Sequence, residues 1–140
     1  MEEEEIVKQI LYNLDNWQLE DETPSNAIDD LECNKKISED EVLHFYNTAY
    51  NYALAYTNRQ DFPVTTIIKT VENEEIEVEE LLQPISTALY MWSAGLLWKK
   101  YNIRANDQID ETYPIGYGDN LIIQAKEILK NYKTYKFQAY

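Results

Sequence analysis

The stretch QPISTALYMWSAGLLWKKY, residues 83–101, decides the fold of this chain. Apolar side chains recur in it at intervals of three and four residues, which places them on one face of an α-helix. Pro84 suits the first helical turn, where its missing N–H would have no partner. Lys99 and Lys100 suit the negative pole of the helix dipole. The sequence therefore predicts a helix over residues 83–101. Its apolar face is formed by Ile85, Ala88, Leu89, Trp92, Leu96 and Leu97.

Small residues in the second half of this helix predict a close contact with another helix. Glycine inside a helix costs about 1 kcal/mol relative to alanine, so Gly95 needs a packing reason. Trp92 and Trp98 lie six residues apart and therefore point in directions that differ by about 240° around the axis. The two indoles cannot easily face one core, and we expect Trp92 rather than Trp98 to lie in it.

The segments after this helix predict a loop, a short helix and a tail. Residues 102–117 are long for a plain connection, and such loops are usually functional or disordered. Asp119 is a good N-cap for a helix over residues 119–132. Residues 133–140, KTYKFQAY, are too short for a fold of their own and rich in aromatic side chains.

Two helices are predicted before residue 60. Ser38 and Glu41 form the capping-box pattern, and the helix they begin should end near Asn58. Residues 1–14 predict a short amphipathic helix that starts with four glutamates, with a frayed acidic terminus as the alternative. Residues 17–36 are interpreted as a linker that contains at most one helical turn.

Residues 64–80 predict a β-hairpin, because β-branched residues dominate the first half and apolar residues alternate with glutamates in the second. The four residues 72–75 are expected to form the turn between the two halves. A continuous acidic helix is the alternative. The predicted fold is therefore mainly α, a small bundle of three to four helices with a hairpin at about 64–80 and an extended C-terminal tail. We divide the chain into an acidic helix and linker (1–36), a helical domain (37–132) and a tail (133–140).

The charge is distributed unevenly. Residues 1–80 carry 21 acids and 5 bases, a net charge of −16, whereas residues 81–140 carry 5 acids and 7 bases, a net charge of +2. These sum to the total of −14. A strongly acidic surface argues against tight nucleic-acid binding, which needs cations against phosphates. The 12 tyrosines are typical of core margins and protein contacts.

No residue pattern predicts catalysis, a cofactor or a metal. Cys33 is the single cysteine and His44 the single histidine, which makes a disulfide within the chain impossible and a zinc cluster improbable. Gly116 and Gly118 precede a helix, but no lysine follows in the phosphate-binding position. The carboxylates of Asp107, Asp110 and Glu111 lack the calcium-loop signature. We expect a non-enzymatic protein, with neither a membrane span nor a secretory signal.

The order of elements resembles the head–tail connector proteins, also called head-completion or adaptor proteins, of tailed bacteriophages and related viruses. The likeness covers about residues 38–137. It is carried by the acidic helix start at 38–46 with Ala49 and Ala53, the Pro-initiated helix 84–101, Tyr117-Gly118-Asp119, and the final helix 121–132 with Tyr135. The acidic N-terminus and the Glu-rich segment 71–80 depart from the family pattern.

The resemblance implies a structural virion protein that forms a ring, commonly a dodecamer, between the portal and the tail. Such a ring would seal the packaged genome at the portal vertex, after assembly in the host cytoplasm, and would provide the surface on which the tail or a stopper protein docks. DNA would pass through the lumen without specific binding. In such rings the C-terminal segment often reaches into the portal.

These implications assign two sets of residues. The expected interface residues are Trp98, Tyr101, Tyr117, Lys133, Tyr135, Lys136, Phe137 and Tyr140. The expected channel-facing or tail-facing residues are Glu72, Glu74, Glu75 and Glu77. The alternative function is an acidic regulatory or DNA-mimic protein that binds a basic partner.

Overall fold

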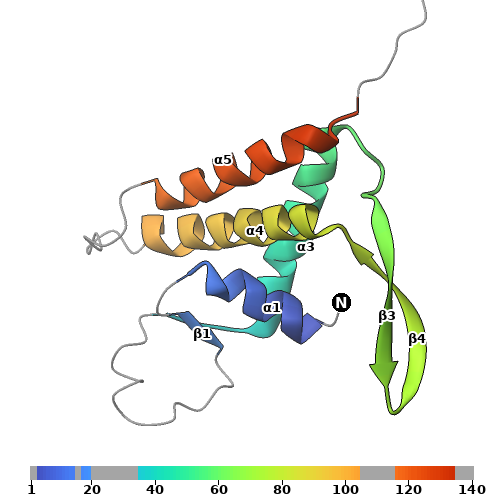
Figure 1. The fold of residues 1–140 in the computed structure, drawn as a ribbon. Helices are drawn as coiled ribbons and strands as arrows, with labels where there is room; N and C mark the ends of the chain where they lie inside the picture. Colours follow the sequence, from blue (N-terminus) through green and yellow to red (C-terminus); the bar gives the residue numbers. More distant parts are fainter. Residues whose placement is uncertain (1–2, 15–16, 20–34, 105–115, 135–140) are drawn as a thin grey trace, which may run out of the picture.

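A computed structural model describes residues 3–14, 17–19, 35–104 and 116–134 of the chain. It is mainly helical, with a long antiparallel hairpin beside the helices (Figure 1). The predicted fold class is confirmed. Most of the expected C-terminal tail (residues 135–140) and most of the loop over residues 102–117 fall outside the described residues.

Two antiparallel helices form the centre of the molecule: α4 (Gln83–Arg104) and α5 (Tyr117–Leu129), which is extended by the 3-10 turn η1 (Lys130–Tyr132) (Figure 1). Gly95 permits their close approach, since a Cβ built there would lie 2.6 Å from the carbonyl oxygen of Gly118. The close helix contact predicted at Gly95 is therefore confirmed. Trp92 is only 5% exposed, which confirms its place in the core.

Helix α3 (Glu39–Thr57) crosses behind α4 (Figure 1). Its limits follow the sequence pattern closely. The Ser38 hydroxyl accepts a hydrogen bond from the Glu41 N–H at 3.2 Å, as the capping box predicts. Asn58 ends the helix in the left-handed conformation, with φ of 57°, which asparagine tolerates better than most residues.

Helix α1 (Glu3–Tyr12) confirms the predicted N-terminal helix. Val7 and Ile10 are fully buried against α3 and α4. The chain segment that follows differs from the expected linker at its two ends: strands β1 (Trp17–Leu19) and β2 (Lys35–Ile37) pair in parallel. Ile37 is 1% exposed and joins the same core.

The hairpin consists of β3 (Val64–Val71) and β4 (Glu74–Leu81) in antiparallel register. The hairpin prediction is confirmed, but the turn is shorter than the four residues expected. Glu72 and Asn73 both have positive φ, 53° and 66°, which is the conformation of a two-residue hairpin turn. Such a turn matches the natural twist of the strands, so pairing continues to Val71 and Glu74.

One predicted cap is wrong. Helix α5 begins at Tyr117, and its N-cap is Gly116 in the left-handed conformation (φ 101°), without a side-chain cap. Asp119 instead lies inside the first turn, where its carboxylate is 2.8 Å from the Lys99 ammonium group. A carboxylate in the first turn still interacts favourably with the helix dipole, so the acidic residue contributes there without capping.

Candidate interaction surfaces

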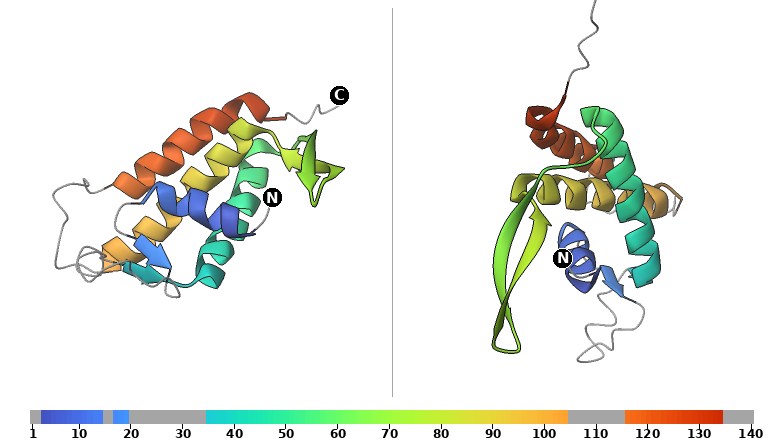
Figure 2. Two further views of the ribbon diagram at one scale, coloured as in Figure 1. Left: turned by 60° about the horizontal axis from the view of Figure 1, so that its bottom comes forward. Right: turned by 90° about the vertical axis from the view of Figure 1, so that its right-hand side faces the viewer.

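The hairpin is a separate arm beside the helical body, as the turned view in Figure 2 shows. In an antiparallel pair, directly opposed residues share a face and successive residues alternate between faces. The register therefore places Glu75, Glu77 and Glu79 on one face of β4, opposite Thr70, Ile68 and Thr66. We call this the acidic face.

The register separates the four glutamates predicted to face a channel. All four are exposed. Glu75 and Glu77 lie on the acidic face, Glu74 lies on the opposite face, and Glu72 lies in the turn. Glu79 belongs to the acidic face and was missed, although strict alternation from Glu75 would have found it.

The hairpin also exposes apolar side chains, which sequence analysis did not identify as a surface. Ile68 is 67% exposed, and Val64, Val71 and Ile76 are between 42% and 49% exposed. Scattered exposed apolar residues are ordinary. The register places Val64 and Ile68 on the acidic face and Val71 and Ile76 on the opposite face, so both faces of the arm offer apolar contact area to another chain.

The predicted interface residues Trp98 and Tyr117 lie together within one subunit. Their rings meet edge to face, with centroids 5.8 Å apart. The Tyr117 hydroxyl donates to the carbonyl oxygen of Asn13 at 2.8 Å and so connects α5 to the end of α1. Both side chains are half-buried, so each retains some surface beyond these internal contacts.

Tyr101 belongs to a charged cluster that joins the end of α4 to the start of α3. The Lys100 ammonium group forms a salt bridge with Glu41 and lies 5.1 Å from the centre of the Tyr101 ring. Hydrogen bonds from Lys100 and Tyr101 lower the pKa of the Glu41 carboxyl below its ordinary value of 4.5. The cluster therefore keeps Glu41 ionised to a lower pH than an isolated glutamate.

The start of the C-terminal tail is fixed to the end of α3. The Thr134 N–H donates to the Thr57 carbonyl at 2.8 Å, and the Asn58 side chain donates to the Thr134 carbonyl at 3.2 Å. The Lys133 ammonium group lies 4.2 Å from the centre of the Tyr56 ring. The other predicted tail residues lie outside the described part of the chain: Tyr135, Lys136, Phe137 and Tyr140.

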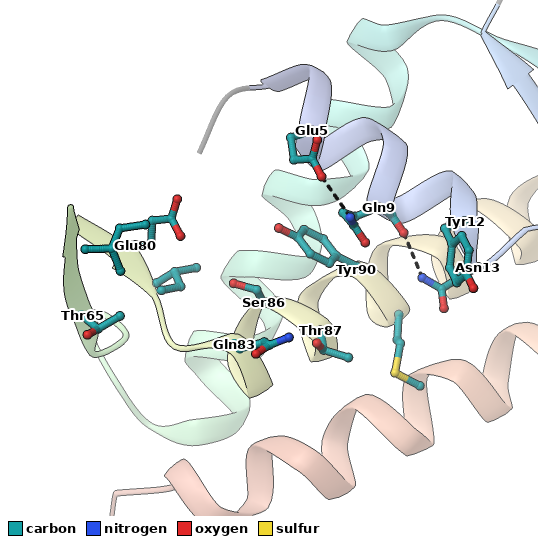
Figure 3. A pocket seen from close by; sticks show the side chains of 13 residues that line it. Glu5, Gln9, Tyr12, Asn13, Thr65, Glu80, Gln83, Ser86, Thr87 and Tyr90 are labelled. Carbon is teal, nitrogen blue, oxygen red and sulfur yellow. Dashed lines mark hydrogen bonds between the residues drawn. The ribbon is translucent and has the colours of Figure 1, made fainter. Parts of the chain in front are cut away.

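A groove of about 610 Å³ lies between α1, the base of the hairpin and the first turns of α4 (Figure 3). Its apolar floor is formed by Ile67, Leu81 and Met91. A smaller hollow of about 170 Å³ shares Leu81 with it and adds Glu79 and Val64 to the lining. The polar residues of the groove are Glu5, Gln9, Asn13, Thr65, Glu80, Gln83, Ser86 and Thr87.

The groove is electrostatically negative. Glu5 from α1, Glu80 from β4 and Tyr90 from α4 line the groove together (Figure 3). Burial raises the pKa of Tyr90, and the charges of Glu5 and Glu80 raise it further, while a hydrogen bond with Ser86 acts in the opposite direction. The described residues that line the groove and its adjoining hollow include no lysine, arginine or histidine.

The chemical groups of the described segments do not form a metal cluster: no three His, Cys, Asp or Glu residues there converge on a common point. His44 is exposed and its ring meets Phe45 edge to face. Cys33, Asp107, Asp110 and Glu111 lie outside the described residues. Among the helices that the structure describes, none combines the length and apolar character needed to cross a membrane.

Comparisons with models of known protein families, with curated proteins and with solved structures gave no match.

Proposed function

We propose that this chain is a structural virion protein that forms a ring adaptor between the portal and the tail, with no enzymatic role. The ring would seal the packaged genome and offer the tail, or a stopper protein, a docking surface. The proposal starts from the resemblance in the order of elements over residues 38–137. The hairpin arm is the structural observation that supports it most strongly.

The arm suits a subunit whose contacts lie outside itself. A two-stranded hairpin is marginally stable by itself in water, and here most of its side chains are exposed. An element of this kind gains stability when it packs against other chains. Val71 and Ile76, which lie on the face opposite the acidic face, would serve such contacts.

The acidic face suits a channel wall. The carboxylates of Glu75, Glu77 and Glu79 repel DNA phosphates. Tight DNA binding needs protein cations that replace the counterions of the phosphates. A wall of carboxylates lacks such cations, so a passing duplex would meet little friction. Helices α1, α3, α4 and α5 pack around two core clusters, and Tyr46 and Met91 contact both. This packing would give the ring a rigid body.

The proposal is tested by combining the purified chain with portal and tail components and imaging the product. Rings located between portal and tail, with hairpins toward the lumen or the tail, would support it. A chain that joins neither component, under conditions in which portal and tail particles are intact, would refute it.

The acidic face also favours a second candidate function, an acidic or DNA-mimic protein that binds a basic partner. Successive carboxylates on one face of a strand are about 7 Å apart, a regular negative row that a cationic surface could recognise. A monomer that binds a basic protein tightly, with an affinity that falls steeply with salt, would favour this function over the ring adaptor.

A further inference from the structure

The groove between α1, the hairpin and α4 has the composition of a peptide-binding site. Its volume is in the usual range for ligand sites. It combines an apolar floor (Ile67, Leu81 and Met91) with hydroxyl and amide groups that can bond a peptide backbone, such as those of Thr65 and Gln83.

Its carboxylates differ in how far they are already neutralised. Glu80 forms a salt bridge with Lys69 at 2.7 Å. Glu5 accepts a hydrogen bond from the neutral Gln9 amide at 3.0 Å, in the exposed first turn of α1. A bound segment that brings a cation to the Glu5 side would complement the groove best.

The chain's own C-terminal segment has this chemistry. Residues 133–140, KTYKFQAY, contain two lysines, three aromatic residues and no acid. In an extended conformation, side chains alternate between sides, so Tyr135 and Phe137 point one way and Lys136 the other. Aromatic residues on the floor would therefore place Lys136 at the acidic margin.

We propose that the groove binds residues 135–140 of a second copy of this chain, the part of the tail that follows the attachment of Thr134 to α3. The inference rests on the self-assembly in the proposed function, and it directs the segment to a neighbouring copy rather than to the portal. A contact in which the tail of one copy enters the groove of the next is head-to-tail, and head-to-tail contacts generate rings when the rotation closes.

The test is a charge exchange between copies of the full chain. Lys136→Glu and Glu5→Lys should each raise the dissociation constant of self-association by at least about tenfold, because each places like charges together. An equimolar mixture of the two variants should regain association, since every tail then meets a groove of opposite charge. The matched controls, Lys130→Glu and Glu127→Lys, change the same charges at exposed positions away from the groove and should associate as the wild type does.

Peptide competition gives a second readout that does not depend on how the variants fold. A synthetic KTYKFQAY peptide should dissociate the assembled wild-type chain, whereas the same peptide with Glu in place of Lys136 should not. The proposal is overturned if the single variants associate normally, if mixing fails to restore association, or if the peptide has no effect. Recovery only when both changes occupy one chain would assign the tail to its own groove and would equally overturn it.

The outcomes separate this inference from the proposed function. Rings that form regardless of the charges at Glu5 and Lys136 would refute the groove contact and leave the ring adaptor intact. A wild-type chain that stays monomeric at every concentration would count against both.

Discussion

Gly95 in α4 and Gly118 in α5 are in reciprocal backbone contact. A Cβ built on Gly95 would lie 2.6 Å from the Gly118 carbonyl oxygen, and a Cβ built on Gly118 would lie 2.7 Å from the Gly95 carbonyl oxygen. Room for a side chain at either glycine would require a helix to move, because the opposing carbonyl oxygens belong to the backbone. The pair therefore sets the separation of the two central helices.

Gly95→Ala should destabilise the protein despite the better helix propensity of alanine. The substitution gains about 1 kcal/mol of propensity, but overpacking typically costs 1–3 kcal/mol or more, here against a rigid backbone atom. We expect a net loss of up to about 2 kcal/mol in the free energy of unfolding, measured by urea denaturation. Thr87→Ala, at an exposed position of the same helix, is the control and should change stability little. A stabilised Gly95→Ala protein would show that the helices separate easily.

Trp92→Ala should cost more stability than Trp98→Ala. Trp92 is 5% exposed and lies against the Tyr56 ring, with centroids 6.2 Å apart, so its truncation should cost about 3–5 kcal/mol. Trp98 is half-buried, so Trp98→Ala should cost less stability than Trp92→Ala. It should have the larger effect on self-association. Paired measurements of unfolding and of oligomer mass would test this division, and the reverse order of stabilities would contradict it.

The salt bridge between Glu41 and Lys100 should make stability depend on pH in the acidic range. The folded-state pKa of Glu41 is lowered, so its contribution is present above the ordinary value of 4.5 and is lost as the pH falls toward the folded-state pKa. The melting temperature of Glu41→Gln should therefore lie below that of the wild type at pH 7, and the difference should shrink as the pH falls below 4.5.

Glu39→Gln is the matched control for this pH dependence. It removes a carboxylate from the same helical turn and keeps the salt bridge with Lys100. A difference between wild type and Glu41→Gln that stays constant from pH 7 to pH 3 would show that the salt bridge is not its source.

Neutralising the acidic face should change contact with DNA and leave the fold intact. Glu75, Glu77 and Glu79 are exposed, so their triple change to glutamine should hardly alter the melting temperature. Weak nonspecific DNA binding should increase in the assembled protein, because repulsion of the phosphates is reduced. Glu74 lies on the opposite face of the same strand. Comparing the DNA binding of Glu74→Gln with that of Glu77→Gln should separate the effects of the two faces. A triple variant that unfolds would indicate a structural role for these side chains.

Local patterns in the sequence predicted the helices well, because their signals lie within a few residues. The Ser38–Glu41 cap and the stop at Asn58 are examples. The prediction of Asp119 as the N-cap was wrong because glycine in the left-handed conformation can begin a helix without a side-chain cap. Helix α5 therefore begins two residues earlier than expected. The two-residue turn was missed because positive φ is unusual for a residue such as Glu72.

The candidate surfaces were harder to predict, because they depend on segments distant in the chain. The groove brings Glu5, Glu80 and Tyr90 together from three elements, and no local spacing relates them. The attachment of Thr134 to the end of α3 joins residues 76 positions apart. The glutamates of β4 were recognised as a group, but only the strand register divided them between two faces.

The solution mass of the purified wild-type chain, measured across a range of concentrations and combined with particle images, tests the central claim most directly. The account predicts a closed ring with a central opening; twelve copies of 16.6 kDa would have a mass of about 200 kDa. A 16.6 kDa monomer at every concentration would contradict it.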